Sequence, residues 1–250
     1  MPGEPKLRRA GSARRAVIDE LDQGARDLAH LAEPGLGHVR IGTMEPMTAI
    51  IAEAIRSLGR THPRITYEIE IGDTGSLVAR LRARQLDVVT TRYHIAAADG
   101  DLNAAWLFRV PLVVVADRRN PLLRRRGLTL AALMDEPWAL SPPETYLGGL
   151  VAAVFQRAGL PLPQATAVTI SIAMRLGLIA GGRFLSVLPR TMLHQPANSA
   201  WLRALGLALP ESAGAIAALT LRGRWTPGPV RLFLDALREV APRIPGVDPM

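Results

Sequence analysis

The sequence contains no cysteine, and of its 30 basic residues only Lys6 is a lysine. The absence of cysteine excludes disulfides, thiolate nucleophiles, iron–sulfur clusters and zinc sites with cysteine ligands. A P-loop requires a lysine beside phosphate, and pyridoxal or Schiff-base enzymes require a lysine inside a pocket. Because Lys6 lies close to the amino terminus, outside any apolar pattern, these enzyme classes are excluded as well.

The sequence also lacks an apolar run near the ~18 residues that a membrane helix needs, and no apolar segment typical of a signal peptide follows its basic start. Yet 48% of the 250 residues are apolar, enough to bury one large or two small cores. We therefore expect a globular, cytoplasmic chain that is neither secreted nor bound to a membrane.

Common catalytic and metal-binding motifs are missing too. The five histidines are scattered without the spacing of metal ligands, and no Gly-x-Ser-x-Gly elbow occurs. Gly35 and Gly37 lack the third glycine of a dinucleotide-binding loop. We expect no cofactor, no metal site and no enzymatic activity.

The amino-terminal region divides into a basic segment and a predicted helix. Residues 1–15 hold five positive charges against Glu4, which accounts for +4 of the net charge of +8. We expect residues 1–12 to be a disordered basic leader, either solvated or in contact with nucleic acid. Within residues 13–34, apolar side chains recur at helical spacing, and Pro34 ends the pattern. Such a stripe needs cover, from a partner chain or from its own domain.

Residues 38–91 show the alternating pattern of an α/β unit. Between residues 65 and 71, isoleucine or tyrosine alternates with threonine or glutamate, which predicts a strand with one polar face. Strands joined through helices in one sheet are parallel, with right-handed crossovers. The predicted order is strand, helix, strand, helix, strand, at residues 39–42, 47–58, 65–71, 75–86 and 87–90.

A second α/β unit follows. The apolar run at residues 110–116 predicts a buried strand. Two further strands are predicted within 206–221, and a helix with Val230, Phe233, Leu234 and Leu237 on one face ends the chain. Between them we expect strands at 137–140, 166–170 and 184–188, and helices at 145–158 and 172–180.

Several groups of residues, taken in order, resemble a known family. They are HVRIG at 38–42, GDT at 72–74 with LDVV at 86–89, PLVVV at 111–115 before NPL at 120–122, LTLAAL at 128–133 with PW at 137–138, and GGRFLSVLPR at 181–190. Their order and spacing resemble the effector-binding region of LysR-type transcriptional regulators over residues 14–241. Residues 14–23 also resemble the linker helix through which such regulators dimerise.

The resemblance implies an α/β fold of two Rossmann-like subdomains joined by two crossing strands, at about 107–117 and 205–221, preceded by the linker helix. This arrangement is like that of type II periplasmic binding proteins. It implies subdomain I at 38–110 plus 212–241 and subdomain II at 111–211. Partners implied are a second copy, or full-length LysR-type paralogues in mixed oligomers.

The sequence departs from the family at its start. Family members carry a winged helix-turn-helix before the linker helix, whereas about a dozen residues precede that helix here. We therefore expect the DNA reader to be missing, through natural truncation or a misplaced start. DNA would then be contacted only indirectly, or through a missing N-terminal domain.

Ligands of such folds bind at the carboxyl ends of strands and at the helix amino termini that follow. Short hydroxyl side chains there suit carboxylates and sugar hydroxyls alike, and an N-cap role is their alternative. Arg92 favours an acidic ligand, whereas Glu45 and Glu144 favour polyols or cations. The predicted ligand-binding residues are Thr43, Met44, Glu45, Thr74, Thr90, Thr91, Arg92, Ser141, Pro142, Pro143, Glu144 and Ser171.

The predicted function is that of an effector-binding domain, which senses a small polar metabolite, a carboxylate or a sugar, and modulates transcription through oligomerisation. Residues 137–143 and 188–190 are most similar to the branch that includes monosaccharide-responsive regulators. Binding would change the angle between the lobes and act on a partner through the helices at 47–58 and 230–240. The alternatives are a cytosolic solute-binding protein and, from the Thr91–Arg92 pair alone, an enzyme similar to prephenate dehydratases.

Overall fold

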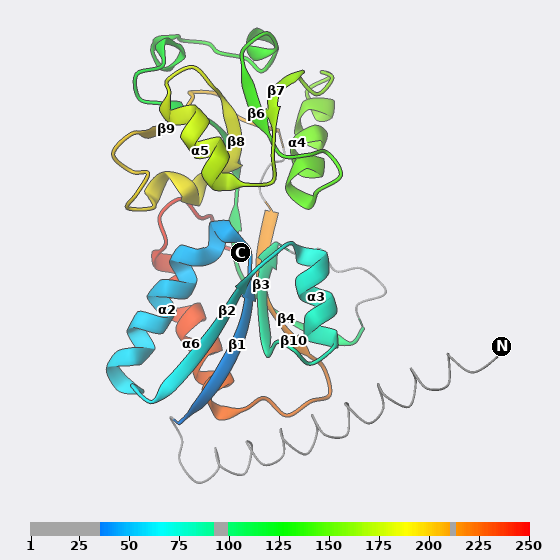
Figure 1. Cartoon of the computed structure of the whole chain (residues 1–250), viewed down its shortest axis with the longest axis vertical. Helices are drawn as coiled ribbons and strands as arrows, with labels where there is room; N and C mark the ends of the chain where they lie inside the picture. Colours follow the sequence, from blue (N-terminus) through cyan, green and yellow to red (C-terminus); the bar gives the residue numbers. More distant parts are fainter. Residues whose placement is uncertain (1–35, 93–99, 211–213) are drawn as a thin grey trace, which may run out of the picture.

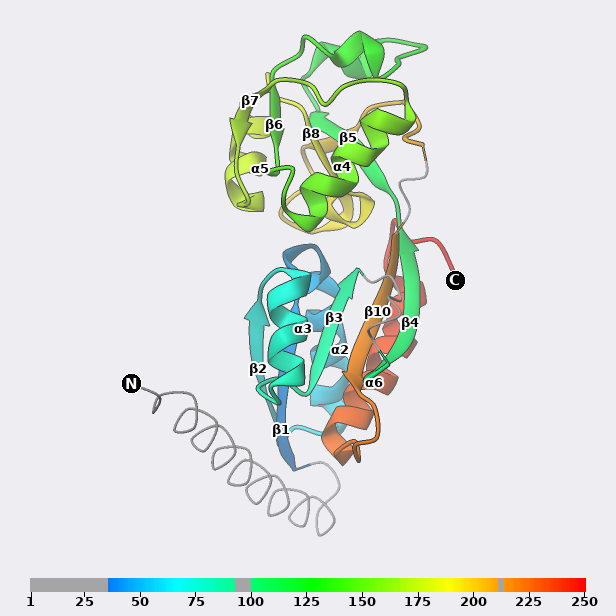
Figure 2. The ribbon, with the colours of Figure 1, turned by 90° about the vertical axis from the view of Figure 1, so that its right-hand side faces the viewer.

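A computed structural model of the chain describes residues 36–92, 100–210 and 214–250 (Figure 1). The leader and helix predicted within residues 1–34 lie outside these ranges. The described chain forms two α/β lobes that follow one another along the longest axis of the molecule (Figures 1 and 2). None of the helices in these ranges is long and apolar enough to cross a membrane.

Lobe I is built on a five-stranded sheet in the order β2-β1-β3-β10-β4. The first three strands along the chain pair in parallel, as the sequence predicts, and β10 runs antiparallel to β3 and to β4. Its elements are β1 (Gly37–Thr43), the 3-10 helix η1 (Glu45–Met47), α2 (Thr48–Thr61), β2 (Ile65–Ile71), α3 (Thr74–Arg82), β3 (Val88–Arg92), β4 (Leu102–Val110), β10 (Gly214–Leu221), α6 (Gly228–Val240) and the 3-10 helix η5 (Ala241–Arg243).

Helices α2 and α6 cover one face of this sheet. Ile50 and Ala54 of α2 share a core with Phe233 and Leu237 of α6, and all four are buried. Each helix contributes an apolar stripe, so burial of these stripes holds both helices on the sheet. The apolar faces are therefore enclosed within lobe I, which leaves the polar faces of these two helices for any partner.

Lobe II contains two smaller sheets, β8-β5-β9 and β6-β7, linked by a bridge from Trp138 to Leu185. The indole of Trp138 packs edge-on against Phe155, with 5.7 Å between ring centroids, and its Nε1 donates to the carbonyl of Leu133 at 2.8 Å. The elements are β5 (Leu112–Asp117), β6 (Trp138–Leu140), α4 (Tyr146–Arg157), β7 (Ala165–Val168), α5 (Ile172–Ala180), β8 (Ser186–Pro189), β9 (Leu202–Ala204) and the 3-10 helices η2 (Pro121–Arg124), η3 (Ala131–Leu133) and η4 (Arg190–His194).

The connections between the lobes differ from two continuous crossing strands. The first is interrupted at Pro111, which separates β4 from β5, because proline has no N–H to donate to a sheet. In the second, β9 ends at Ala204 and β10 begins at Gly214. The strand predicted near Gly206 thus lies earlier in the chain.

Two other features bear on the predicted boundaries. The helix predicted to reach residue 86 ends at Arg82, where the chain turns through Arg84 with φ of 62°. Residues buried before Pro111 and after Gly214 form cores separate from those buried between them. These separate cores support our proposed division into subdomain I at 38–110 plus 212–241 and subdomain II at 111–211.

Candidate functional site

The carboxyl ends of β1, β2 and β3 point toward lobe II (Figure 2). There the hydroxyl of Thr90 donates to Thr43 at 3.4 Å, and the hydroxyls of Thr74 and Thr91 lie 2.6 Å apart. Thr74 also donates to the sulfur of Met44 at 3.7 Å. The structure therefore brings these five predicted residues together at the edge of lobe I that faces lobe II.

Arg92 ends β3 in the same place and is only 3% exposed. Its NH2 donates to the carbonyl of Val110, whereas its NH1 is buried without a hydrogen-bond partner among the described residues. Burial lowers the pKa of Arg92, and its interaction with Tyr146 opposes that shift. Gly214 packs on this side chain so closely that a Cβ would lie 2.6 Å from Cδ and Nε.

The predicted residues of lobe II lie at the start of α4. Ser141 follows β6 and is buried, and Pro143 and the exposed Glu144 form a turn that is closed by the hydrogen bond from the N–H of Thr145 to the carbonyl of Pro142. None of these four residues is the N-cap of α4. That role belongs to Thr145, whose hydroxyl accepts the hydrogen bond from the N–H of Gly148 at 3.1 Å. The hydroxyl of Ser141 thus has no capping role.

By contrast, Ser171, the predicted serine at the start of α5, is the N-cap of that helix. Ser171 is exposed, and its hydroxyl accepts from the N–H of Met174 at 3.2 Å. In lobe I the corresponding cap of α3 is Asp73, which accepts from Ser76, so Thr74 is free of that role. The alternative to ligand binding, a role as helix N-cap, therefore applies to Ser171 but not to Thr74.

Two residues that the sequence reasoning missed extend the site from lobe II. Arg175 of α5 is 1% exposed, and its Nε and NH1 are buried without partners in the described chain. Burial lowers the pKa of Arg175 to about 10, and the negative charge of Glu45 acts in the opposite direction. Tyr146 of α4 has a buried hydroxyl, likewise without a partner there, and burial raises its pKa against the effect of Arg92. Arg175 is the only charge in the segment IAMRLGLIA, which is the signal that was available.

The two lobes bring these four side chains close enough for their charges to influence one another in two pairs. Glu45 and Arg92 belong to lobe I, whereas Arg175 and Tyr146 belong to lobe II, and the electrostatic pairs are Glu45 with Arg175 and Arg92 with Tyr146. Buried polar groups in folded proteins nearly always have hydrogen-bond partners. Four of the seven buried side-chain atoms without partners in the described chain belong to Arg92, Tyr146 and Arg175, which makes the space between the lobes a candidate binding site.

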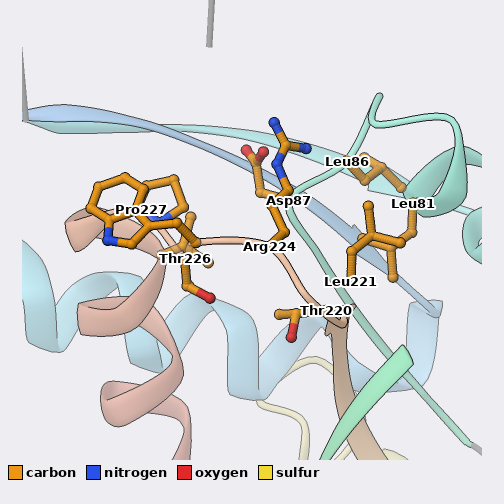
Figure 3. Close-up of a pocket in the computed structure, with 10 residues that line it drawn as sticks. Leu81, Leu86, Asp87, Thr220, Leu221, Arg224, Thr226 and Pro227 are labelled. Atoms are coloured by element: carbon orange, nitrogen blue, oxygen red, sulfur yellow. The ribbon is translucent and has the colours of Figure 1, made fainter. Parts of the chain in front are cut away.

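A surface pocket at the opposite end of lobe I is a weaker candidate (Figure 3). It is open to solvent, and it contains none of the predicted residues. Its carboxylate, Asp87, is already engaged by Arg40 at 2.7 Å. Within the described ranges, no three histidine or acidic side chains lie close enough to hold a metal ion. The pocket is lined by Leu81, Leu86, Asp87, Thr220, Leu221, Arg224, Trp225, Thr226, Pro227 and Val230.

Two α/β lobes with polar side chains gathered between them define a two-lobed ligand-binding protein. The family model for the LysR substrate binding domain matches residues 32–242, so the chain belongs to the LysR substrate-binding domain family. The family predicted from the sequence is thereby confirmed.

Similar proteins agree with this assignment. The HTH-type transcriptional regulator GbpR of Azospirillum brasilense is 28% identical over 182 residues, 71% of this chain and 53% of the relative. The chain spans about half the length of the curated relatives it matches. Among solved structures, the CcmR regulatory domain of Synechocystis PCC6803 in complex with 2-PG matches with a TM-score of 0.71 and 21% identity, over 82% of this chain and 97% of that one.

The effector binding domain of QuiR in complex with shikimate has the same fold. It matches with a TM-score of 0.69 and 18% identity, over 83% of this chain and 98% of that chain. These likenesses confirm the predicted two-lobed fold, similar to type II periplasmic binding proteins.

Proposed function

We propose that this chain is the effector-sensing part of a LysR-type transcriptional regulator, which binds a small polar metabolite, a carboxylate or a sugar, between its lobes. The observation that carries the proposal is the set of buried, unpartnered donors on Arg92, Tyr146 and Arg175, contributed by both lobes. The structural neighbours CcmR and QuiR, in complex with 2-PG and with shikimate, support a small-molecule ligand.

We further propose that the chain does not transform its ligand. The relatives it matches are transcriptional regulators. Dehydratase-like chemistry rests on Thr91 and Arg92, but the hydroxyl of Thr91 is engaged with Thr74 and the guanidinium is bonded to Val110. A regulator of transcription works in the cytoplasm of a bacterium, and we propose contact with DNA through other parts of the whole protein or through paralogues.

A second copy of the chain is the partner that we propose. Ile69 and Ile71 of β2 are 47% and 53% exposed at an edge of the lobe I sheet. In lobe II, three apolar residues are also exposed: Val168 at the end of β7, which is an edge strand too, Ile170 just after it, and Met174 in the first turn of α5. The strands β2 and β7 and the helix α5 lie toward the same side of the molecule (Figure 2). A two-fold axis lying in the plane of this side and perpendicular to the long axis of the molecule would place each group on the other, which is the self-complementary arrangement of a symmetric dimer.

Calorimetry of the purified chain against a broad panel of metabolites tests the binding function. We expect saturable binding of at least one small polar compound, with no product formed on prolonged incubation. Binding that is lost in Tyr146→Phe and retained in a matched Tyr67→Phe variant, whose hydroxyl is buried in lobe I beside Phe233, would support a ligand between the lobes. The proposal is contradicted if the chain converts any panel member into a product, or if it binds none of them. A chain that is monomeric in sedimentation experiments favours a solute-binding protein instead.

A further inference from the structure

We propose that the ligand held between the lobes is a small carboxylate anion and not a neutral sugar, that Arg175 is its main anchor, and that Glu45 supplies the opposing charge when no ligand is bound. This inference rests on the proposed function, because it names the chemical class of the ligand for the same site. It assigns a role to each charged side chain that the two lobes bring together there.

The first support is the balance of charge. Arg92 and Arg175 are nearly inaccessible to solvent, and neither makes an ion pair within the described chain. Glu45 is the acidic group that acts on Arg175, and the group that acts on Arg92 is the phenol of Tyr146, which is neutral at pH 7. Two positive charges thus face one negative charge. Burying an unpaired charge is costly, and an anion removes the excess whereas a sugar does not.

The second support is the balance of donors and acceptors. Guanidinium groups donate and never accept, and three of the unpartnered nitrogens, Nε and NH1 of Arg175 and NH1 of Arg92, belong to them. A carboxylate supplies two acceptor oxygens and no donor, so it satisfies such a set directly. Every sugar hydroxyl that accepts a hydrogen bond also brings a donor that needs an acceptor. The threonine hydroxyls of lobe I already bond to one another, but each hydroxyl oxygen has two acceptor lone pairs, so they can still accept from hydroxyl groups on the same anion.

The third support is the rigid placement of Arg175. The backbone N–H of Arg175 donates to the carbonyl of Ser171 at 3.2 Å in the first turn of α5. Ile172 and Ile179 fix this helix in the core of lobe II. A buried side chain on a helix that is fixed through its apolar face is an effective anchor because little conformational entropy is lost when the ligand binds.

The carboxylate of Glu45 competes with a ligand carboxylate for the positive charge of Arg175. Glu45 begins η1 directly after β1 and is exposed, and its charge reaches Arg175 without forming an ion pair within 4.0 Å. A ligand carboxylate that binds Arg175 must therefore come close to a second negative charge. We infer that the Glu45 charge lowers the affinity for anions and has little effect on neutral ligands.

Titration calorimetry of the full chain tests this with matched probes: gluconate against glucose, shikimate against its methyl ester, and benzoate against benzamide. We expect at least one carboxylate to bind at least 10-fold more tightly than its neutral counterpart. Arg175→Met should weaken that binding roughly 10- to 100-fold, because a charged hydrogen bond is lost. Glu45→Gln should tighten it roughly 3- to 10-fold, because a like charge is removed. Arg238→Gln, at an exposed arginine of α6, is the matched control and should change neither value.

A ligand-free measurement keeps the inference testable whichever probe binds. If Arg175 is a binding residue held at a cost, Arg175→Met raises the melting temperature of the free chain, because an unpaired buried charge is replaced by an apolar side chain of similar length. A purely structural arginine gives a lower melting temperature. Equal binding of a neutral probe by wild type and Arg175→Met overturns the anion inference and leaves the proposed function intact. If no carboxylate probe binds wild type or Glu45→Gln, the anion inference is overturned as well, whereas the proposed function falls only if the broad panel also fails.

Discussion

At Gly214, any side chain collides with Arg92, because a Cβ would lie 2.6 Å from two of its atoms. We predict that Gly214→Ala displaces Arg92 from the carbonyl of Val110 and costs about 1–3 kcal/mol of unfolding free energy, as overpacking does. Ligand affinity should fall with it. Urea denaturation and calorimetry measure the two effects.

The control is Gly59→Ala in α2, where nothing lies within 4 Å of the new methyl group. That change should stabilise the chain by roughly 0.5–1 kcal/mol, and destabilisation of both variants alike would contradict this account.

Asp73 gives a prediction with a defined pH dependence. The backbone N–H of Ser76, followed by its hydroxyl, lowers the pKa of Asp73 in the folded chain. A lowered folded pKa means that the stabilisation is complete above the unfolded pKa of ~3.9 and is lost as the pH falls through the folded pKa. Asp73→Ala should therefore cost about 1 kcal/mol at pH 7 and less near pH 3 in urea denaturation. Asp73→Asn keeps the cap without the charge, so its cost should not shrink in the same way, and a constant penalty for Asp73→Ala would refute the pH dependence.

At the scale of elements, the edge strand β2 carries two exposed isoleucines, Ile69 and Ile71, and the edge strand β7 ends with the exposed Val168. We predict that Ile69→Glu or Ile71→Glu, which places charge in the proposed contact, shifts the chain from dimer to monomer in sedimentation velocity experiments. Thermal stability of the monomer should change little, because both side chains are about half exposed. Glu68→Gln, an exposed change on the same strand, is the control. A dimer that survives both isoleucine substitutions rules out this surface.

The elements were largely predictable, and the reason is local periodicity. The helix expected at 172–180 has these same limits in the structure, because its apolar spacing and the serine before it are local signals. The interruption at Pro111 was not anticipated, although proline is a known sheet breaker, because the apolar run continues through it. Sequence patterns also did not reveal Tyr146 and Arg175. Their significance comes from proximity to Arg92 and Glu45, which only the packing of one lobe on the other creates.

For the whole molecule, a ligand anchored from both lobes should stabilise both. A ligand that binds only the native state adds about 2.7 kcal/mol at a concentration 100 times its Kd. We therefore predict that hydrogen exchange slows together in β3 and α5 when a ligand saturates the chain, since Arg92 and Arg175 lie in these elements. Mass spectrometry of exchanged peptides measures this. Protection confined to one lobe would show that the ligand does not span the two.

The hydrogen bond from Arg92 to Val110 has a mechanical consequence. Val110 is the last residue before the proline that interrupts the first connection, so one nitrogen of a ligand-facing guanidinium is fastened at the pivot about which the lobes would turn. A ligand that binds NH1 of Arg92 and shifts its guanidinium would therefore move the backbone at Val110, to which NH2 is bonded. A small ligand held by Arg92 would thereby act directly on the relative orientation of the two lobes.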